Sequence, residues 1–185
     1  MALLSISADA LSAQERLPRV SVDGSVGAGH GWRGGERTDR GLIAGDFLVT
    51  FQPHGNARRG AIIGLEVSRD WQLNGDLNCP VRPGGGCIPQ YPGFDALSAV
   101  AGYDWGSSAV RARVLGGLGY YTAYFDHNST AEHSIGAGAR TDIAARLFAA
   151  VFATATARVG WVPHIRGDSY VPGAFVIGLR IMAGA

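Results

Sequence analysis

Residues 149–161 read AAVFATATARVGW, and their side chains alternate between two kinds of surface. The odd-numbered positions hold only Ala, Val and Trp, whereas Thr154, Thr156, Arg158 and Gly160 all fall on even-numbered positions. A period of two is the signature of a β-strand whose two faces meet different environments. This segment therefore predicts a strand with one apolar face and one polar face.

Seven further segments of the chain alternate in the same way, at about 19–31, 41–52, 59–72, 97–105, 109–124, 133–143 and 173–182. The connections expected after the odd strands are long, at about 32–40, 73–93, 125–132 and 162–172, and those after the even strands are shorter. Short turns at one end and long loops at the other are typical of outer-membrane barrels. The pattern predicts an all-β fold over residues 18–185, an eight-stranded antiparallel up-and-down transmembrane β-barrel.

Two places in this assignment leave a choice. The junction 144–148 between the sixth and seventh strands carries no Gly or Pro, and the Ala-rich stretch 143–157 is also compatible with a helix. Residues 1–17 are expected to be a leader. They are either the tail of an export signal peptide or a short disordered segment, because Asp9 interrupts the apolar run and no basic residue precedes Arg16.

Two sets of residues indicate which face of the strands points outward. Aromatic residues of the apolar face gather near strand ends, as in the girdles of membrane barrels: Trp32, Trp71, Tyr103, Trp105, Tyr120, Tyr124 and Trp161. The polar face carries acidic and basic residues in equal number, which would pair across a narrow lumen: Asp23, Asp46, Glu66, Asp104, Arg111, Arg113, Arg140, Asp142, Arg158 and Arg180. Both sets favour an apolar face turned towards lipid, and Arg69 on that face is expected to snorkel to lipid head groups. The alternative is a soluble lipocalin-like barrel, with the apolar face turned inward around a ligand.

Composition narrows the class of protein further. No apolar run reaches the ~18–20 residues of a membrane helix, whereas a barrel strand needs only ~9–11. A net charge of +1 argues against nucleic-acid binding, which requires a concentrated basic patch. Cys79 and Cys87 bracket a Pro- and Gly-rich loop and are expected to form a local disulfide in an exported protein. Two thiols alone do not make a zinc site, so neither a metal nor a cofactor is expected.

Taken together, these segments resemble the small eight-stranded outer-membrane proteins of the OmpA/OmpX-like kind, over about residues 18–185. The resemblance rests on pattern. It implies a porin-like protein of the bacterial outer membrane and cell surface, in contact with membrane lipid and lipopolysaccharide, folded by the outer-membrane assembly machinery and monomeric. The last strand of this family normally ends in an aromatic residue, whereas this chain ends Ile181-Met182-Ala183-Gly184-Ala185.

The lumen of an eight-stranded barrel is just wide enough for its own side chains to fill. The charges are therefore expected to plug it, and the leading hypothesis is a non-enzymatic surface protein whose external loops interact with partners. A gated narrow conduit for ions or small solutes is a second interpretation. The rival class is a lipid A-modifying enzyme with a Ser/His site at the outer rim, drawn from His30, His127, His133, His164, Ser129, Ser134, Asp126 and Asp168.

Two local sequences bear on these hypotheses. His133 and Ser134 are adjacent and face opposite sides of the expected strand, which argues against a deacylase-like arrangement. Arg166-Gly167-Asp168 matches the integrin-binding tripeptide, but Gly-Asp is equally a good turn sequence.

Overall fold

The computed structural model describes residues 19–33, 36–53, 55–56, 59–72, 93–124, 131–165 and 167–184. Eight long strands form the fold: β1 (Arg19–Arg33), β2 (Glu36–Gln52), β4 (Arg59–Gln72), β5 (Gly93–Gly106), β6 (Val110–Tyr124), β7 (Glu132–Phe148), β8 (Val151–Ile165) and β10 (Pro172–Gly184). Two short strands, β3 (Gly55–Asn56) and β9 (Asp168–Tyr170), pair with β4 and β8.

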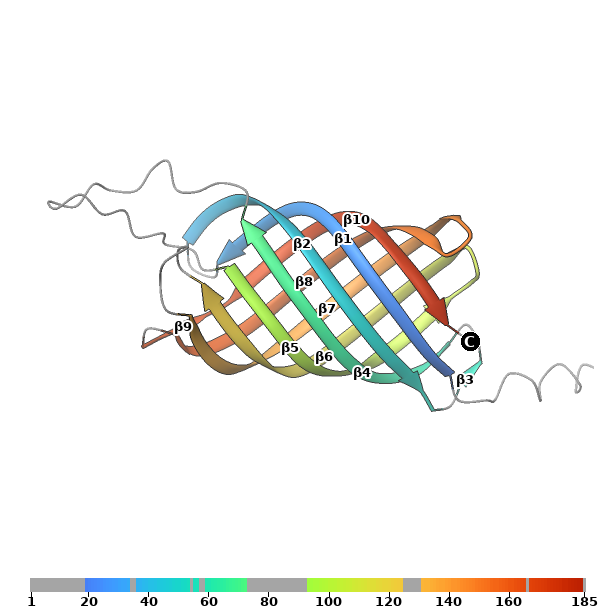
Figure 1. The fold of residues 1–185 in the computed structure, drawn as a ribbon, viewed down its shortest axis with the longest axis horizontal. Helices are drawn as coiled ribbons and strands as arrows, with labels where there is room; N and C mark the ends of the chain where they lie inside the picture. Colours follow the sequence, from blue (N-terminus) through green and yellow to red (C-terminus); the bar gives the residue numbers. More distant parts are fainter. Residues whose placement is uncertain are drawn as a thin grey trace, which may run out of the picture.

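Each long strand pairs antiparallel with its neighbour in sequence, and β10 pairs with both β8 and β1. The sheet therefore closes, and the prediction of an all-β, eight-stranded antiparallel barrel is confirmed (Figure 1). We call the end where residues 73–92 and 125–131 connect the strands the loop end. The opposite end, with the connections 107–109 and 149–150, is the turn end. No helix in the described part of the chain is long and apolar enough to cross a membrane.

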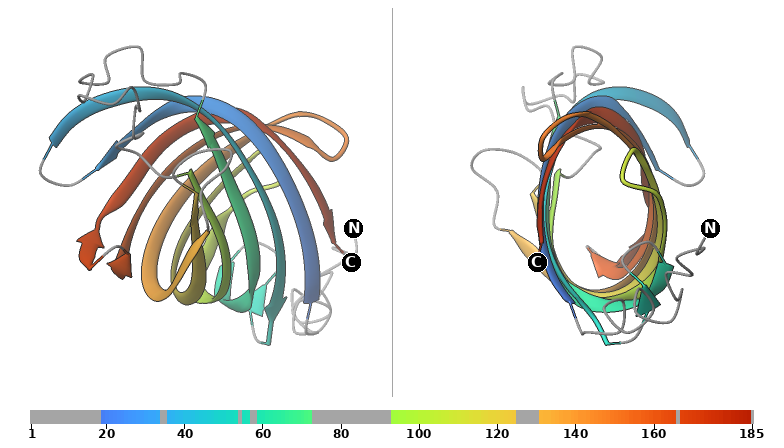
Figure 2. Two further views of the ribbon diagram at one scale, coloured as in Figure 1. Left: turned by 60° about the vertical axis from the view of Figure 1, so that its left-hand side comes forward. Right: turned by 90° about the vertical axis from the view of Figure 1, so that its right-hand side faces the viewer.

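Two glycines face each other at the seam where β1 and β10 pair and close the barrel. Gly27 of β1 faces Gly178 of β10 across it. A Cβ atom at Gly178 would lie 2.2 Å from the carbonyl oxygen of Val26, and one at Gly27 would lie 2.6 Å from that of Ile177. Side chains are thus excluded on the inner surface here, where the strands approach closely. Figure 2 shows the closed wall from the side and along the lumen.

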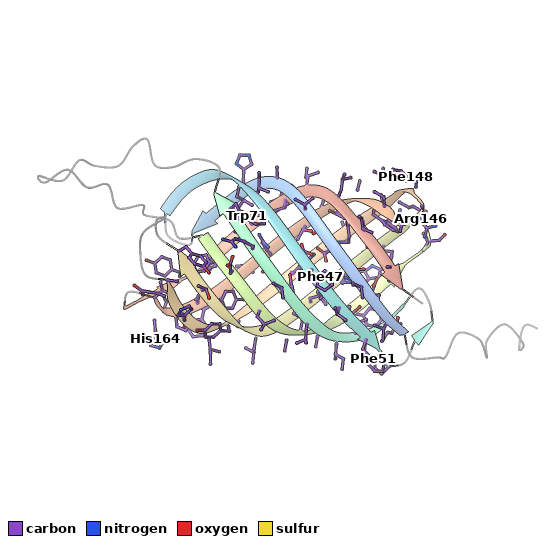
Figure 3. The ribbon with its side chains drawn as sticks, in the orientation of Figure 1. Phe47, Phe51, Trp71, Arg146, Phe148 and His164 are labelled. Carbon is purple, nitrogen blue, oxygen red and sulfur yellow. The ribbon has the colours of Figure 1, made fainter. Side chains whose placement is uncertain are left out.

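The two faces of the wall differ as the alternation predicts. Large hydrophobic side chains point outward along every long strand, with Leu118 67% exposed and Ile177 62% exposed. The charged side chains of the predicted polar face point inward, and Asp23 and Arg180 are 0% and 1% exposed. Phe47, Phe51 and Phe148 are likewise exposed, and Figure 3 shows Phe51 standing away from the wall. This arrangement is the inverse of a soluble barrel with an apolar interior.

The predicted junction at 144–148 between the sixth and seventh strands is wrong. Strand β7 continues to Phe148, and the turn lies at Ala149 and Ala150. Ala149 adopts a positive φ of 40°, a conformation that tight hairpin turns need and that Gly usually supplies. The usual turn signal is missing from the sequence because Ala takes the place of Gly. The Ala-rich stretch pairs as strand, so the helical alternative is also wrong.

Two of the long connections expected after odd strands are shorter than predicted. Strands β1 and β2 extend to Arg33 and Glu36, which leaves only residues 34–35 between them. Strand β8 runs on to Ile165, and β9 folds back against it, with Val162 opposite Tyr170. Both hairpins continue beyond the alternating segments because main-chain pairing does not require an apolar face.

Candidate functional site in the barrel lumen

At the turn end, a buried arginine spans the lumen. Arg113 of β6 donates from Nη1 to Oδ2 of Asp23 at 2.6 Å and from Nη2 to Oδ2 of Asp104 at 3.0 Å. Arg111 donates to the same Asp104 oxygen at 2.6 Å. The side chains of Arg113 and Asp23 are 3% and 1% exposed. Four charges from three strands are therefore paired in this layer.

Midway along the barrel, Arg140 of β7 is surrounded by three carboxylates. Its Nε donates to both oxygens of Asp142, at 2.8 and 2.9 Å. Its Nη1 donates to Oε1 of Glu66 at 2.5 Å, and its Nη2 donates to Oδ1 of Asp46 at 3.1 Å. All three nitrogens of this guanidinium are used, so Arg140 is the centre of the network.

Further side chains complete the middle layer. Asp142 accepts a hydrogen bond from the hydroxyl of Thr156 at 2.7 Å and forms an ion pair with Arg180 at 3.0 Å. Ser25 donates to Asp46 at 2.5 Å. Buried charges tolerate a low-dielectric site only when they are paired and hydrogen-bonded in this way.

Nearer the loop end, Arg158 of β8 pairs with Asp70 of β4. Beside this pair lies a cavity of about 80 Å³ with charged and hydroxyl-bearing residues in its wall, including Glu66, Ser68, Ser98, Tyr121 and Arg140. Several of the other lining positions are glycines on the inner face, so the wall there has no side chains to fill the space: Gly117, Gly138 and Gly160.

Above the cavity, a hydrophobic cluster occupies the loop end of the lumen. Phe94 of β5 packs edge-on against Tyr170 of β9, with ring centroids 6.4 Å apart. Ala123, Val162 and Ile165, each 0% exposed, complete the cluster. A second buried apolar cluster lies inside the wall of β2, β4, β5 and β6 and consists of Leu48, Ile62, Val100 and Leu115.

Three arginines make ion pairs between opposite walls of the barrel. Arg113 and Asp23 belong to β6 and β1, and β6 is the fourth strand on from β1 when the wall is followed through β2, β4 and β5. The same separation holds for the pair of Arg140 with Asp46, from β7 and β2, and for the pair of Arg158 with Asp70, from β8 and β4. In a ring of eight strands, a partner four strands away lies directly opposite. The side chains therefore cross the lumen at three positions along the axis.

All ten charged residues expected on the inner face take part in the contacts above. The sequence pattern places Asp70, the partner of Arg158, on the same face of β4 as Glu66, but the predicted charge network did not include it. The sequence prediction also missed the cluster around Phe94 and Tyr170. No simple pattern reveals that cluster, because β9 is only three residues long.

Six of the seven expected interface aromatics are exposed on the outer surface, in two groups. Trp71, Tyr120, Tyr124 and Trp161 lie near the loop end, and Tyr103 and Trp105 lie near the turn end. Trp32 belongs to β1, but its side chain lies outside the described residues. Figure 3 shows Trp71 at one end of the barrel and Phe51 and Phe148 at the other.

The residues expected for a rim Ser/His site do not form one group where they are described. The imidazole Nδ1 of His133 lies 3.1 Å from the hydroxyl of Thr122, and its ring stacks on Tyr120. Ser134 donates to the carbonyl of Ile135 instead. His30 and His164 are exposed and belong to other strands, β1 and β8. Within the described part, no three His, Cys, Asp or Glu residues are grouped as metal ligands would be.

Several sequence predictions fall outside the described residues. These are the rim candidates Asp126, His127 and Ser129, the expected disulfide of Cys79 and Cys87, the leader 1–17, and the side chains of Arg166 and Asp168.

No family model matches this chain, and no curated protein matches it in sequence. Its fold does match solved structures. Neisserial surface protein A aligns with a TM-score of 0.59 at 13% identity, covering 88% of this chain and 96% of the other. Ail, the attachment invasion locus protein of Yersinia pestis, aligns with a TM-score of 0.52 at 13% identity, covering 89% of this chain and 98% of the other. At this level of identity, the likeness establishes a shared eight-stranded barrel fold.

Proposed function

We propose that this chain is a bacterial outer-membrane β-barrel protein with a closed lumen, and that its role is non-enzymatic binding through the loops at its loop end. The observation that carries the proposal is the inversion of the barrel. Of the described residues, 27 large hydrophobic side chains are exposed on the outside, while eleven polar or charged residues are buried. An apolar surface of this extent is stable in lipid and is rarely left exposed to water.

The two groups of exposed aromatics support the same location. Trp and Tyr concentrate at the two membrane–water interfaces of membrane proteins, where their rings meet lipid and their polar atoms meet water. Here they lie at the two ends of an apolar band. The fold shared with Neisserial surface protein A and Ail is consistent with this assignment.

Two observations support the proposal of a closed lumen: the three ion pairs that cross it and the apolar cluster at the loop end. The cavity between them is about 80 Å³, which corresponds to a few water molecules. Specific binding then falls to the loops, because loops on a rigid scaffold are where barrels carry recognition. The same loops would contact lipopolysaccharide, and the chain would reach the membrane through the outer-membrane assembly machinery.

A gated conduit is the second candidate function. Buried polar atoms in the described lumen, among them Oδ1 of Asp23, Nε of Arg113 and Nε of Arg180, make no hydrogen bond to another protein atom. Buried polar atoms without hydrogen bonds raise the free energy of a conformation, which favours a second side-chain conformation in which these atoms are hydrogen-bonded. Such a rearrangement would open the narrow path that the ion pairs now block.

Refolding the full chain from urea into detergent micelles and then into phospholipid vesicles tests the proposal. A closed membrane barrel should resist detergent on an unheated gel and migrate differently after boiling. Vesicles carrying it should not leak small ions at rest. Absence of a heat-dependent shift would refute the membrane barrel, and steady single-channel conductance in a planar bilayer would favour the conduit.

Incubation of the refolded protein with lipid A tests the non-enzymatic part separately. We expect the mass of the lipid to remain unchanged by mass spectrometry. Loss or gain of an acyl chain would instead establish the lipid-modifying activity that the rim histidines suggest.

A further inference from the structure

One arginine on the outer wall is held in place by its neighbours. Arg69 of β4 has its guanidinium carbon 5.4 Å from the ring centre of Trp71 and 5.9 Å from that of Tyr124. Its Nε lies 3.3 Å from Oδ1 of Asp95, and its side chain is 52% exposed. Cation–π contacts on two rings and one carboxylate contact fix the orientation of the side chain. The ion pair uses Nε, and among the described residues no hydrogen bond engages the two terminal amino groups, so they can meet a ligand from the membrane side.

The same wall carries an apolar groove closer to the turn end. It has a volume of about 720 Å³ and extends from the edge of β1 across the outer faces of β2, β4, β5 and β6. Large side chains such as Ile63, Leu65 and Leu118 form its sides, whereas Ala99, Ala101 and Gly116 form its floor. The groove exists because three small residues lie between large ones on neighbouring strands.

The arginine and the groove lie at a spacing that suits one lipid molecule. Leu65 and Ile63 precede Arg69 by four and six residues on β4, which corresponds to about 13 and 20 Å along the strand. Barrel strands tilt by about 35–45°, so these positions lie about 10–15 Å deeper in the membrane than Arg69. That depth matches half of a hydrocarbon core of about 30 Å.

We propose that the outer wall of β4–β6 binds one phosphate-bearing lipid, with its phosphate on Arg69 and one acyl chain in the groove. The inference rests on the proposed membrane location and adds a defined lipid site to it. Because Arg69 lies at the loop end, the lipid belongs to the leaflet on that side, which in an outer membrane is lipopolysaccharide. An arginine hydrogen bond to phosphate is charge-assisted and gives the headgroup its specificity.

Asp95 sets the strength of this site. Its carboxylate already pairs with Arg69 and repels an incoming phosphate. Asp95→Asn should therefore tighten lipid binding, whereas Arg69→Gln should weaken it. If Arg69 only anchors the barrel by snorkelling to the interface, Asp95→Asn should not increase the affinity for lipid, because such an arginine holds no particular lipid molecule.

The chain provides matched controls for both halves of the site. Arg146 is also an exposed arginine over an aromatic ring, 5.4 Å from the centre of Phe152, but that ring is buried on the inner face at the turn end. Arg146→Gln therefore removes one positive charge away from the lipid-facing wall. Gly24 on the outer face of β1 has open space around it, with no atom within 4 Å of where a Cβ would lie. At Gly116, the nearest atom to a Cβ would be 3.9 Å away. A Cβ atom therefore fits at either glycine, and only a side chain at position 116 extends into the groove.

Native mass spectrometry of the refolded full chain in detergent micelles tests the site, with lipid A and dephosphorylated lipid A as the two probes. We expect one lipid A bound and about ten-fold weaker binding of the dephosphorylated form. Arg69→Gln should weaken binding of lipid A about ten-fold, and Gly116→Leu should weaken it about five-fold. Arg146→Gln and Gly24→Leu should leave the binding of lipid A unchanged. Inorganic phosphate added alone should not displace lipid A, because it makes no contact with the groove.

Three results would overturn the lipid site. These are equal binding of both lipid forms, equal weakening by Arg69→Gln and Arg146→Gln, and binding of lipid A that Gly116→Leu leaves unchanged. Displacement by inorganic phosphate alone would show a free-phosphate site instead. Each variant is first checked for its heat-dependent gel shift, so that failure to form a membrane barrel is recognised separately from failure to bind lipid.

Discussion

Arg113 of β6 reaches Asp23 of β1 on the opposite wall of the barrel, and the two side chains meet at 2.6 Å. Both are almost completely buried. Two strands that share no backbone hydrogen bonds are joined by this contact, so the barrel is braced from inside as well as around its circumference. Arg140 with Asp46 and Arg158 with Asp70 repeat the same relationship at other levels.

A double-mutant cycle on Arg113 and Asp23 should show strong coupling. Asp23→Leu alone leaves Arg113 buried with Asp104 as its remaining partner, and we expect a loss of about 3 kcal/mol in the free energy of unfolding. Replacing both residues, with Arg113→Met, should recover much of that loss because no charge is left unpaired. Urea unfolding in phospholipid vesicles measures all four corners. Additive effects of the two single changes would mean that the pair does not act as a unit.

Arg140→Gln should be the most damaging change in the lumen. It leaves Asp142, Glu66 and Asp46 close together without their shared cation, and Arg180 then compensates only one of them. We expect a loss of about 3–5 kcal/mol. The control is Arg146→Gln at an exposed site, which should change stability by no more than about 0.5 kcal/mol. Similar unfolding midpoints for both variants would contradict a structural role for the Arg140 cluster.

Alternation in the sequence is enough to place charges on the inner face, because a strand has only two sides. Arg111 and Arg113 are two residues apart on β6 and therefore share a face, as do Arg140 and Asp142 on β7. The alternation does not predict which of the inward-facing charges form ion pairs with one another. Partners such as Arg158 and Asp70 lie 88 residues apart, and their contact depends on the stagger of all the strands between them.

The ends of the strands were predicted less well than their middles, for two physical reasons. At Ala149, the main chain adopts a positive φ without Gly, so the usual sequence signal of a turn is missing. Between Arg33 and Glu36 and between Ile165 and Asp168, pairing extends past the apolar segments. There the hydrogen bonds of the main chain keep the hairpin together, and side-chain alternation gives no indication of where it stops.

Gly178→Ala should weaken the seam between β1 and β10. The new methyl group would lie 2.2 Å from the Val26 carbonyl oxygen, which belongs to the backbone and cannot move without shifting β1. We expect a loss of about 1–3 kcal/mol. Gly24→Ala, in open space on the same strand pair, is the matched control and should be nearly neutral. The measurement is the temperature at which the folded band disappears from the gel. Gly178→Ala should lower this temperature and Gly24→Ala should not, whereas an equal effect of both changes would contradict a special role for the seam.

Leu118→Arg and Val110→Arg together test whether the outer face lies in lipid. Leu118 is near the middle of β6 and Val110 is its first residue, and both side chains point outward, with exposures of 67% and 49%. In water, an arginine at either exposed site would cost little. In a bilayer, the cost depends on depth, about 2–4 kcal/mol at the midplane and about 0–1 kcal/mol near the interface. Unfolding in phospholipid vesicles should therefore separate the two variants by about 2 kcal/mol or more. Equal stabilities would place Leu118 outside the hydrocarbon core and would remove the main support for a membrane barrel.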